Sequence, residues 1–177
     1  MKNQIFLIAT FTLIFCFCSY KTDAQARKNA NKQTTEWRYE IQCQGTGVQG
    51  TYLIKVWSYS RKPQVATEQA KKNAVHGIIF KGFAGTSTVG GCTSQNALAR
   101  NPNLEEEKAE FFKLFFADGG KYMKFVTFSN DGAVGAGDIT KISKREYKVG
   151  VVVSVKKDAL RKDLENAGIL KSLSSGF

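Results

Sequence analysis

The sequence is poor in the residues that build metal and redox centres. His76 is the only histidine, and the four cysteines include no Cys-x-x-Cys pair. Structural zinc sites take four cysteine or histidine ligands, and dithiol redox enzymes use closely spaced cysteines. Asp131 and Asp138 lack the closely alternating carboxylates of a calcium loop. The sequence therefore predicts no metal site and no redox centre.

Catalytic and cofactor motifs are also incomplete. The glycines of residues 45–50 match a dinucleotide fingerprint, but a β-branched and aromatic segment follows them instead of the required helix. His76 and Cys92 could act as base and nucleophile only if Cys92 were a free thiol. The glutamates of residues 105–107 fill the first turn of a predicted helix and have no matching carboxylate. We therefore expect no catalytic residues and no cofactor. A small hydrolase using Cys92 or the acidic residues around Asp131 is the remaining enzymatic alternative.

No hydrophobic run reaches the length of a membrane-spanning helix. The apolar run at residues 5–18 has about 14 residues, whereas a spanning helix needs roughly 20. Lys2 precedes this run, and the small residues Ala24 and Ala26 follow it. A charged start, a short apolar core and small residues before a cleavage point are typical of a secretory signal peptide. We therefore expect residues 1–26 to be cleaved and the protein to be periplasmic or secreted. An uncleaved anchor is the alternative.

The four cysteines divide into two pairs with different expected fates. Cys16 and Cys18 each follow a bulky phenylalanine, although lipid-attachment sites need a small residue there. We therefore expect both to be removed with the signal peptide. Cys43 and Cys92 remain, and two cysteines in an oxidising compartment predict one disulfide. Closing a loop of about 50 residues would stabilise the fold by roughly 4 kcal/mol.

Positive charge is abundant, but no stretch of the sequence concentrates it. The chain carries a net charge of +11, and the loss of residues 1–26 would lower it to about +10. The basic residues are spread from Arg27 to Lys171 without a stripe of interleaved aromatics, which disfavours a nucleic-acid partner. A diffuse positive field suits anionic lipid headgroups, acidic glycans or an acidic protein. A solvated basic surface is the alternative.

Periodicity predicts a single α+β domain. Residues 27–35 are polar without periodicity and predict a flexible leader, so the folded domain spans residues 36–177. Apolar patterning predicts five strands, over residues 37–43, 51–60, 122–128, 139–143 and 147–155. Apolar residues at helical spacing predict three helices, over residues 64–80, 104–118 and 158–168. This order predicts two to three helices packed on one face of a mainly antiparallel sheet.

Three details of this prediction concern single elements. Residues 104–118 are expected to form one continuous helix that stops at the following glycines. Residues 122–128 are apolar on both faces and predict a strand in the interior of the sheet. Asp158 is expected to cap the last helix.

Residues 81–103 predict a long loop rich in glycine. A structureless stretch of this length in a compact domain is unusual and often functional. A bond between Cys43 and Cys92 would tether the loop to the sheet. We expect the loop and nearby aromatic residues to contact a partner, and the candidate contacts are Trp57, Tyr59 and Phe83.

Two segments carry a resemblance to a known family. Residues 66–74, Ala-Thr-Glu-Gln-Ala-Lys-Lys-Asn-Ala, follow a strand pair, and the valine-alternating residues 147–155 precede a short helix. Over residues 51–80 and 145–168 the chain resembles the LPP20-like envelope lipoproteins and the N-terminal domain of flagellar assembly protein T. The resemblance implies a non-enzymatic, envelope-associated role in binding or assembly. The chain departs from that pattern in its glycine-rich insert at residues 81–103 and in lacking a usable lipid-attachment cysteine.

These observations predict an exported binding or assembly module of the bacterial cell envelope, with an envelope protein as partner. The alternative is a basic protein that holds an acidic envelope polymer or makes peripheral contact with an anionic lipid surface. The two predictions differ in their response to salt, because charge-led binding weakens steeply with ionic strength and apolar docking does not.

Overall fold

The computed structural model describes residues 25–26, 28–30, 37–85 and 92–172. Most of the predicted signal peptide and leader lies outside the described residues, and the parts that are described, residues 25–26 and 28–30, are helical. Within the described residues, no helix combines the length and the apolar character needed to cross a membrane.

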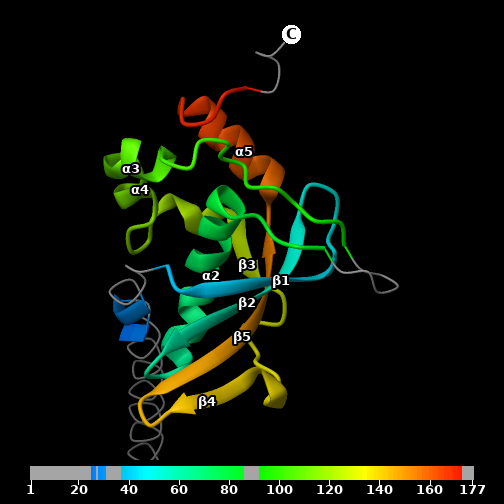
Figure 1. Ribbon diagram of the computed structural model, residues 1–177, viewed down its shortest axis with the longest axis vertical. Helices are drawn as coiled ribbons and strands as arrows, with labels where there is room; N and C mark the ends of the chain where they lie inside the picture. Colours follow the sequence, from blue (N-terminus) through cyan, green and yellow to red (C-terminus); the bar gives the residue numbers. More distant parts are fainter. Residues whose placement is uncertain (1–24, 27, 31–36, 86–91, 173–177) are drawn as a thin grey trace, which may run out of the picture.

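A five-stranded antiparallel sheet forms the centre of the fold (Figure 1). Its strands are β1 (Tyr39–Thr46), β2 (Tyr52–Ser60), β3 (Val126–Phe128), β4 (Ile139–Ser143) and β5 (Glu146–Val155). β2 pairs with β1 on one side and β5 on the other. β3 and β4 pair with opposite ends of the far edge of β5. The α+β class and the antiparallel sheet predicted from periodicity are confirmed.

Helices occupy the connections. They are α2 (Pro63–Phe80), α3 (Leu104–Glu107), α4 (Ala109–Phe115) and α5 (Lys157–Asn166), together with the 3-10 helices η2 (Lys121–Phe125) and η3 (Ala136–Asp138). In Figure 1, α2 lies along one side of the sheet.

The packing of α2 on the sheet builds the core. Ala66, Ala70 and Ala74 are fully buried, and residues this small allow the helix axis to approach the strands closely. The strands present a matching row of fully buried side chains, Ile54, Val56, Val149, Val151, Val153 and Val155. Burying each such side chain stabilises the fold by roughly 1.5–3 kcal/mol relative to leaving it exposed. One face of the sheet is thereby committed to α2.

The prediction of one continuous helix over residues 104–118 is wrong. The segment is divided into α3 and α4 at Lys108, whose φ of −116° and ψ of 31° are not helical. Residues 106–110 are all exposed, so no packed face supports a continuous helix through this point. Beyond the break, Phe112, Phe115 and Phe116 are buried in the core.

The predicted inner strand over residues 122–128 is also wrong. Its first part is the 3-10 helix η2, in which Tyr122 and Phe125 are buried at the three-residue spacing that suits this helix type. Only Val126–Phe128 forms a strand, and that strand pairs with β5 alone among the described strands. Asp158 lies in the first turn of α5, whereas Lys156 holds the cap position without a side-chain cap bond.

The loop over residues 81–103 is tied to the rest of the fold wherever it is described. Phe83 and Gln95 exchange two backbone hydrogen bonds of 2.9 Å each. Leu98 and Ala99 donate backbone hydrogen bonds to the carbonyls of Ile78 and Ile79 at the end of α2. Carbonyls in the last turn of a helix have no partner within that helix, so this segment completes the bonding of α2.

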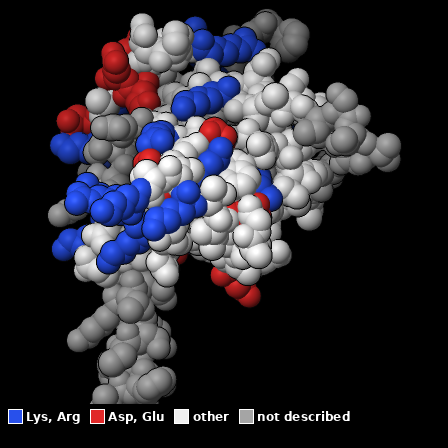
Figure 2. All heavy atoms as spheres, turned by 60° about the horizontal axis from the view of Figure 1, so that its bottom comes forward, with Lys and Arg blue, Asp and Glu red and all other residues white. Residues whose placement is uncertain are grey.

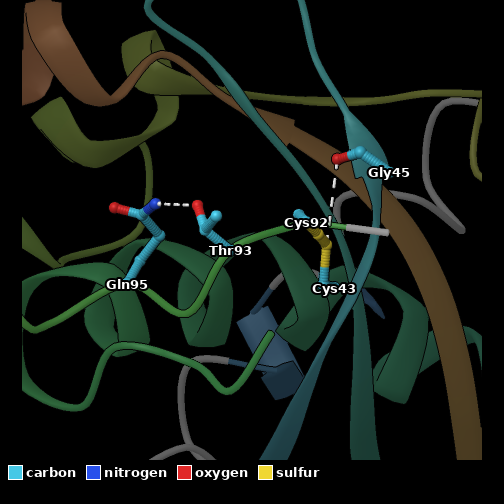
Figure 3. The surroundings of a disulfide bond; sticks show 5 residues. All are labelled: Cys43, Gly45, Cys92, Thr93 and Gln95. Carbon is cyan, nitrogen blue, oxygen red and sulfur yellow. Dashed lines mark hydrogen bonds between the residues drawn. A yellow bond between two sulfur atoms is a disulfide. The ribbon is translucent and has the colours of Figure 1, made fainter. Parts of the chain in front are cut away.

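Cys43 of β1 and Cys92 form a disulfide, as predicted (Figure 3). Their Cα atoms are 6.2 Å apart, within the range of natural disulfides. Next to the bond, Gln95 Nε2 donates a hydrogen bond of 3.1 Å to Thr93 Oγ1. The disulfide therefore connects the edge strand of the sheet to the loop that donates hydrogen bonds to the last carbonyls of α2.

Replacing both cysteines, as Cys43→Ser with Cys92→Ser, is expected to lower the free energy of unfolding by about 4 kcal/mol, because the bond restricts the unfolded chain. Urea unfolding of the variant and of the oxidised wild type measures the difference. Reduced wild type should match the variant. A non-reducing peptide map without a Cys43–Cys92 link, or equal stability of variant and oxidised wild type, would contradict this assignment.

Candidate functional site

The side of the sheet that points away from α2, here called the open face, carries two of the three predicted contact residues. Side chains alternate between the faces of a strand, so Trp57 and Tyr59 of β2 point outward together. The other side chains of this face are Arg38, Glu40, Gln42, Leu53, Lys55, Glu146, Lys148, Gly150, Val152 and Ser154. Aromatic, cationic and anionic groups therefore share one surface.

Trp57 lies flat across the open face. A Cβ atom placed on Gly150 of β5 would lie 2.9 to 3.0 Å from three consecutive carbons of the indole six-membered ring. Near-equal distances to three consecutive atoms mean that the ring turns its face, not its edge, toward the Gly150 backbone. The indole Nε1 donates a hydrogen bond of 3.0 Å to Gln42 Oε1 on β1. Trp57 thus spans three strands, with its second face directed away from the sheet.

Charged hydrogen bonds hold Tyr59 beside Trp57. The Tyr59 hydroxyl donates to Glu40, and Lys148 Nζ donates to both oxygens of the same carboxylate at 2.8 and 3.0 Å. The Lys148 bond, followed by the Tyr59 bond, lowers the pKa of Glu40 below its usual range. The bond to Glu40 in turn raises the pKa of Lys148. Both charges are therefore fixed at neutral pH.

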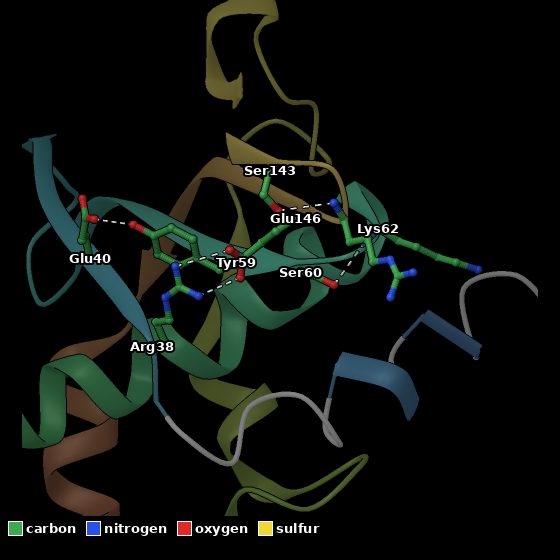
Figure 4. A network of polar contacts seen from close by, with 8 residues as sticks. Arg38, Glu40, Tyr59, Ser60, Lys62, Ser143 and Glu146 are labelled. Carbon is green, nitrogen blue, oxygen red and sulfur yellow. Dashed lines mark hydrogen bonds and ion pairs between the residues drawn. The ribbon is translucent and has the colours of Figure 1, made fainter. Parts of the chain in front are cut away.

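Arg38 completes this network (Figure 4). Its guanidinium donates to Glu146 at 2.7 Å and lies 4.2 Å from the centre of the Tyr59 ring. In Figure 4 the Tyr59 hydroxyl points toward Glu40 and the Arg38 guanidinium toward Glu146. The side chains of the open face are thus positioned before any ligand arrives, which lowers the entropic cost of binding.

Five exposed cations gather where β2 ends and the β4–β5 hairpin turns. Ser60 of β2 and Lys141 of β4 both pair with Tyr147 of β5, so two distant segments of the sequence meet here. The group, called the basic end below, consists of Arg61, Lys62, Lys141, Lys144 and Arg145. None of these five forms an ion pair with another residue in the described ranges.

Figure 2 shows Lys and Arg side chains gathered on the side of the molecule that carries β4, with a few carboxylates among them. The basic residues of the basic end therefore come from two separate parts of the sequence. The diffuse positive field stays a prediction from the order of the residues.

Phe83, the third predicted contact residue, lies elsewhere. Its side chain is only 8% exposed and packs edge-on against Tyr52, with 5.1 Å between the ring centres. Tyr52 belongs to the core-facing row of β2 and donates a hydrogen bond of 2.6 Å to Gln95 Oε1. Phe83 therefore anchors the loop to the core and does not share a surface with Trp57 and Tyr59.

A second constellation is buried beneath the sheet. His76 of α2 is 3% exposed, and its Nδ1 lies 2.6 Å from the Tyr39 hydroxyl. Its Nε2 lies 3.0 Å from Glu105 Oε2. Burial, followed by the charges of Lys81 and Lys72, lowers the pKa of His76 to about 3. The neutral ring then accepts a hydrogen bond from Tyr39 and donates one to Glu105.

His76 itself is enclosed by aromatic rings and is not paired with a nucleophile. Trp37 stacks on the His76 ring with 3.6 Å between the ring centres, and Phe80 and Phe116 pack around it. Cys92, the nucleophile that the sequence suggested for His76, is bonded to Cys43. Across the residues that the structure describes, no three acidic, cysteine or histidine side chains meet as metal ligands.

The role of Glu105 was missed by the sequence analysis. Its carboxylate was assigned to the first turn of a helix. The sequence gives no indication that this residue reaches His76 of α2. Burial raises the pKa of Glu105. A glutamate opposite a lone buried histidine could be identified only from the three-dimensional packing.

Stability should fall on acidification because of His76. Unfolded His76 titrates near 6.5 and the folded residue near 3, so the unfolded chain binds more protons throughout this window. Between pH 7 and pH 5 this costs about 2 kcal/mol; Glu105, with its raised pKa, opposes the effect at the acid end. Urea unfolding at both pH values measures the loss.

The control is His76→Gln, which leaves the chain without a histidine. The variant should be less stable than wild type at pH 7, yet its stability should change little between pH 7 and pH 5. The same slope in variant and wild type would contradict the assignment.

Comparison with known proteins identifies no relative of this chain. No protein-family model matches the sequence, no curated protein is significantly similar to it, and no solved structure is significantly similar to the fold. The resemblance to the LPP20-like lipoproteins stays a prediction from the residues that carry it.

Proposed function

We propose that this protein is an exported, non-enzymatic binding module of the bacterial cell envelope that holds an acidic polymer. The observation that carries the proposal is the basic end, where five exposed cations lie together without ion-pair partners among the described residues. Unpaired surface cations attract counterions, and a polyanion that displaces them gains the entropy of their release. The net charge of +11, which the loss of residues 1–26 lowers to about +10, adds long-range attraction for the same ligand.

Several observations support export. The pattern of residues 1–26 is that of a cleavable signal peptide. The Cys43–Cys92 disulfide is typical of proteins from oxidising compartments. The resemblance to envelope lipoproteins points to the same location.

A binding role is supported by the state of His76 and Cys92, the candidate base and nucleophile. His76 is enclosed by aromatic rings, and Cys92 is held in a disulfide. The charged groups of the open face are instead fixed to each other at the surface, as in a preformed recognition site. The envelope-protein partner expected at the 81–103 loop is less well supported, because Phe83 is buried.

An anionic lipid surface is a second candidate ligand, favoured by one observation on β4. Ile139 and Ile142 are 42% and 43% exposed, and each lies two residues before a lysine of the basic end, Lys141 and Lys144. Apolar side chains beside lysines are typical of surfaces that enter the headgroup region of an anionic membrane.

The test reverses charge at the basic end with Lys141→Glu, Lys144→Glu and Arg145→Glu together. Binding to polygalacturonate, measured by calorimetry at low salt, should weaken at least tenfold. Wild-type affinity should itself fall steeply as salt is raised. The matched control carries the same change in charge at the exposed lysines Lys108, Lys124 and Lys162, and should lose less than threefold.

Equal losses in the two triple variants would show that net charge alone attracts the polymer and would contradict the proposal. Flotation with phosphatidylglycerol vesicles separates the two ligands. Vesicle binding without polymer binding, abolished when Ile139 and Ile142 are both replaced by serine, would replace the polymer by the lipid surface.

A further inference from the structure

We infer that the acidic polymer is a polysaccharide and that Trp57 is the platform on which one of its sugar rings stacks. This inference rests on the proposed function and deepens it, because it assigns a second part of the ligand site. The basic end recognises charge alone, whereas the open face carries features that select for the shape and chemistry of the repeating unit.

The orientation of Trp57 is the first of these features. An aromatic ring that lies flat on a sheet exposes a planar apolar surface, and the Gly150 backbone and the Gln42 amide fix it in that orientation. The axial C–H groups of a pyranose form a flat apolar patch of matching shape. Because the indole is already locked, stacking does not require a side chain to become ordered.

Two cations lie over the ring of the platform. Lys55 Nζ lies 5.6 Å and Lys148 Nζ 5.1 Å from the centre of the Trp57 ring. Both are held there by carboxylates, Lys55 by Asp138 at 2.9 Å and Lys148 by Glu40 at 2.8 Å. A sugar ring stacked on Trp57 would therefore have two ammonium groups within reach of its acidic substituents.

The carboxylates distinguish a sugar from a nucleic acid. Glu40, Asp138 and Glu146 lie among the cations of this region, where each can accept hydrogen bonds from hydroxyl groups. The backbone of DNA has no free hydroxyl group to donate to these carboxylates. A polymer whose sugar rings carry hydroxyl groups as well as acidic groups matches both the cations and the carboxylates.

The platform and the basic end are neighbours along β2. Trp57 and Tyr59 lie two residues apart on the open face, about 7 Å along the strand, and Arg61 of the basic end begins the bend that follows β2. A chain that stacks on Trp57 can therefore continue past Tyr59 toward the basic end. The two parts act as one track, along which ring stacking and charge pairing add.

The test compares two polyanions on the same variants. Trp57→Ala should weaken binding of polygalacturonate or chondroitin sulfate at least fivefold and leave polyphosphate affinity within twofold of wild type. Trp57→Phe should restore part of the loss, because phenylalanine keeps a flat ring. The matched control Leu114→Ala removes exposed apolar surface from α4, outside the open face, and should change neither affinity. Circular dichroism confirms that each variant is folded.

Fluorescence gives a second measurement on the wild type. The chain has two tryptophans, so the ligand-induced change in emission should disappear in Trp57→Phe, which retains Trp37.

Each other outcome overturns the inference. If Trp57→Ala leaves glycan affinity unchanged, or weakens polyphosphate binding equally, the platform is refuted while the proposed function stands. Failure of the wild type to bind either glycan, with polyphosphate still bound, has the same meaning. Failure to bind any of the three polymers refutes the proposed function as well. Tighter, Trp57-dependent binding of single-stranded DNA would assign the platform to nucleic-acid bases instead.

Discussion

The close packing of α2 against β2 and β5 is the constraint on which the rest of this structure depends. Three alanines at four-residue spacing bring the helix onto a surface of valines and isoleucines, and all of these side chains are fully buried. Because strands alternate, this commitment sends Trp57, Tyr59, Lys55 and their neighbours to the other side. The core and the candidate binding surface are thus two consequences of one periodicity.

The polar side chains on the two sides of the sheet differ in charge and in burial. Inside, burial keeps His76 neutral, and its hydrogen bonds to Tyr39 and Glu105 connect α2 to β1 and α3. Outside, Arg38 and Lys148 stay charged and are paired with carboxylates, so they position the aromatic rings. The cations of the basic end have no such partners in the described part of the chain, and they are the groups most available to a ligand.

Elements whose pattern is local were predictable from the sequence. The alternation of β2 and β5 and the alanine spacing of α2 identify three elements and the face that each one buries. The break at Lys108 and the 3-10 helix η2 were not predictable, because they depend on which side chains the rest of the fold can cover. The site divides in the same way. That Trp57 and Tyr59 share a face follows from β2 alone, whereas Gly150 under the indole depends on strand register.

The central proposal is that the open face of the sheet, and not the 81–103 loop, is the binding surface. Titrating ¹⁵N-labelled protein with oligogalacturonate and following the two indole N–H signals tests it most directly. The account predicts that the Trp57 signal moves together with the amides of β1, β2 and β5, while Trp37 and residues 92–103 stay unchanged. Shifts confined to residues 92–103, with Trp57 unaffected, would contradict it.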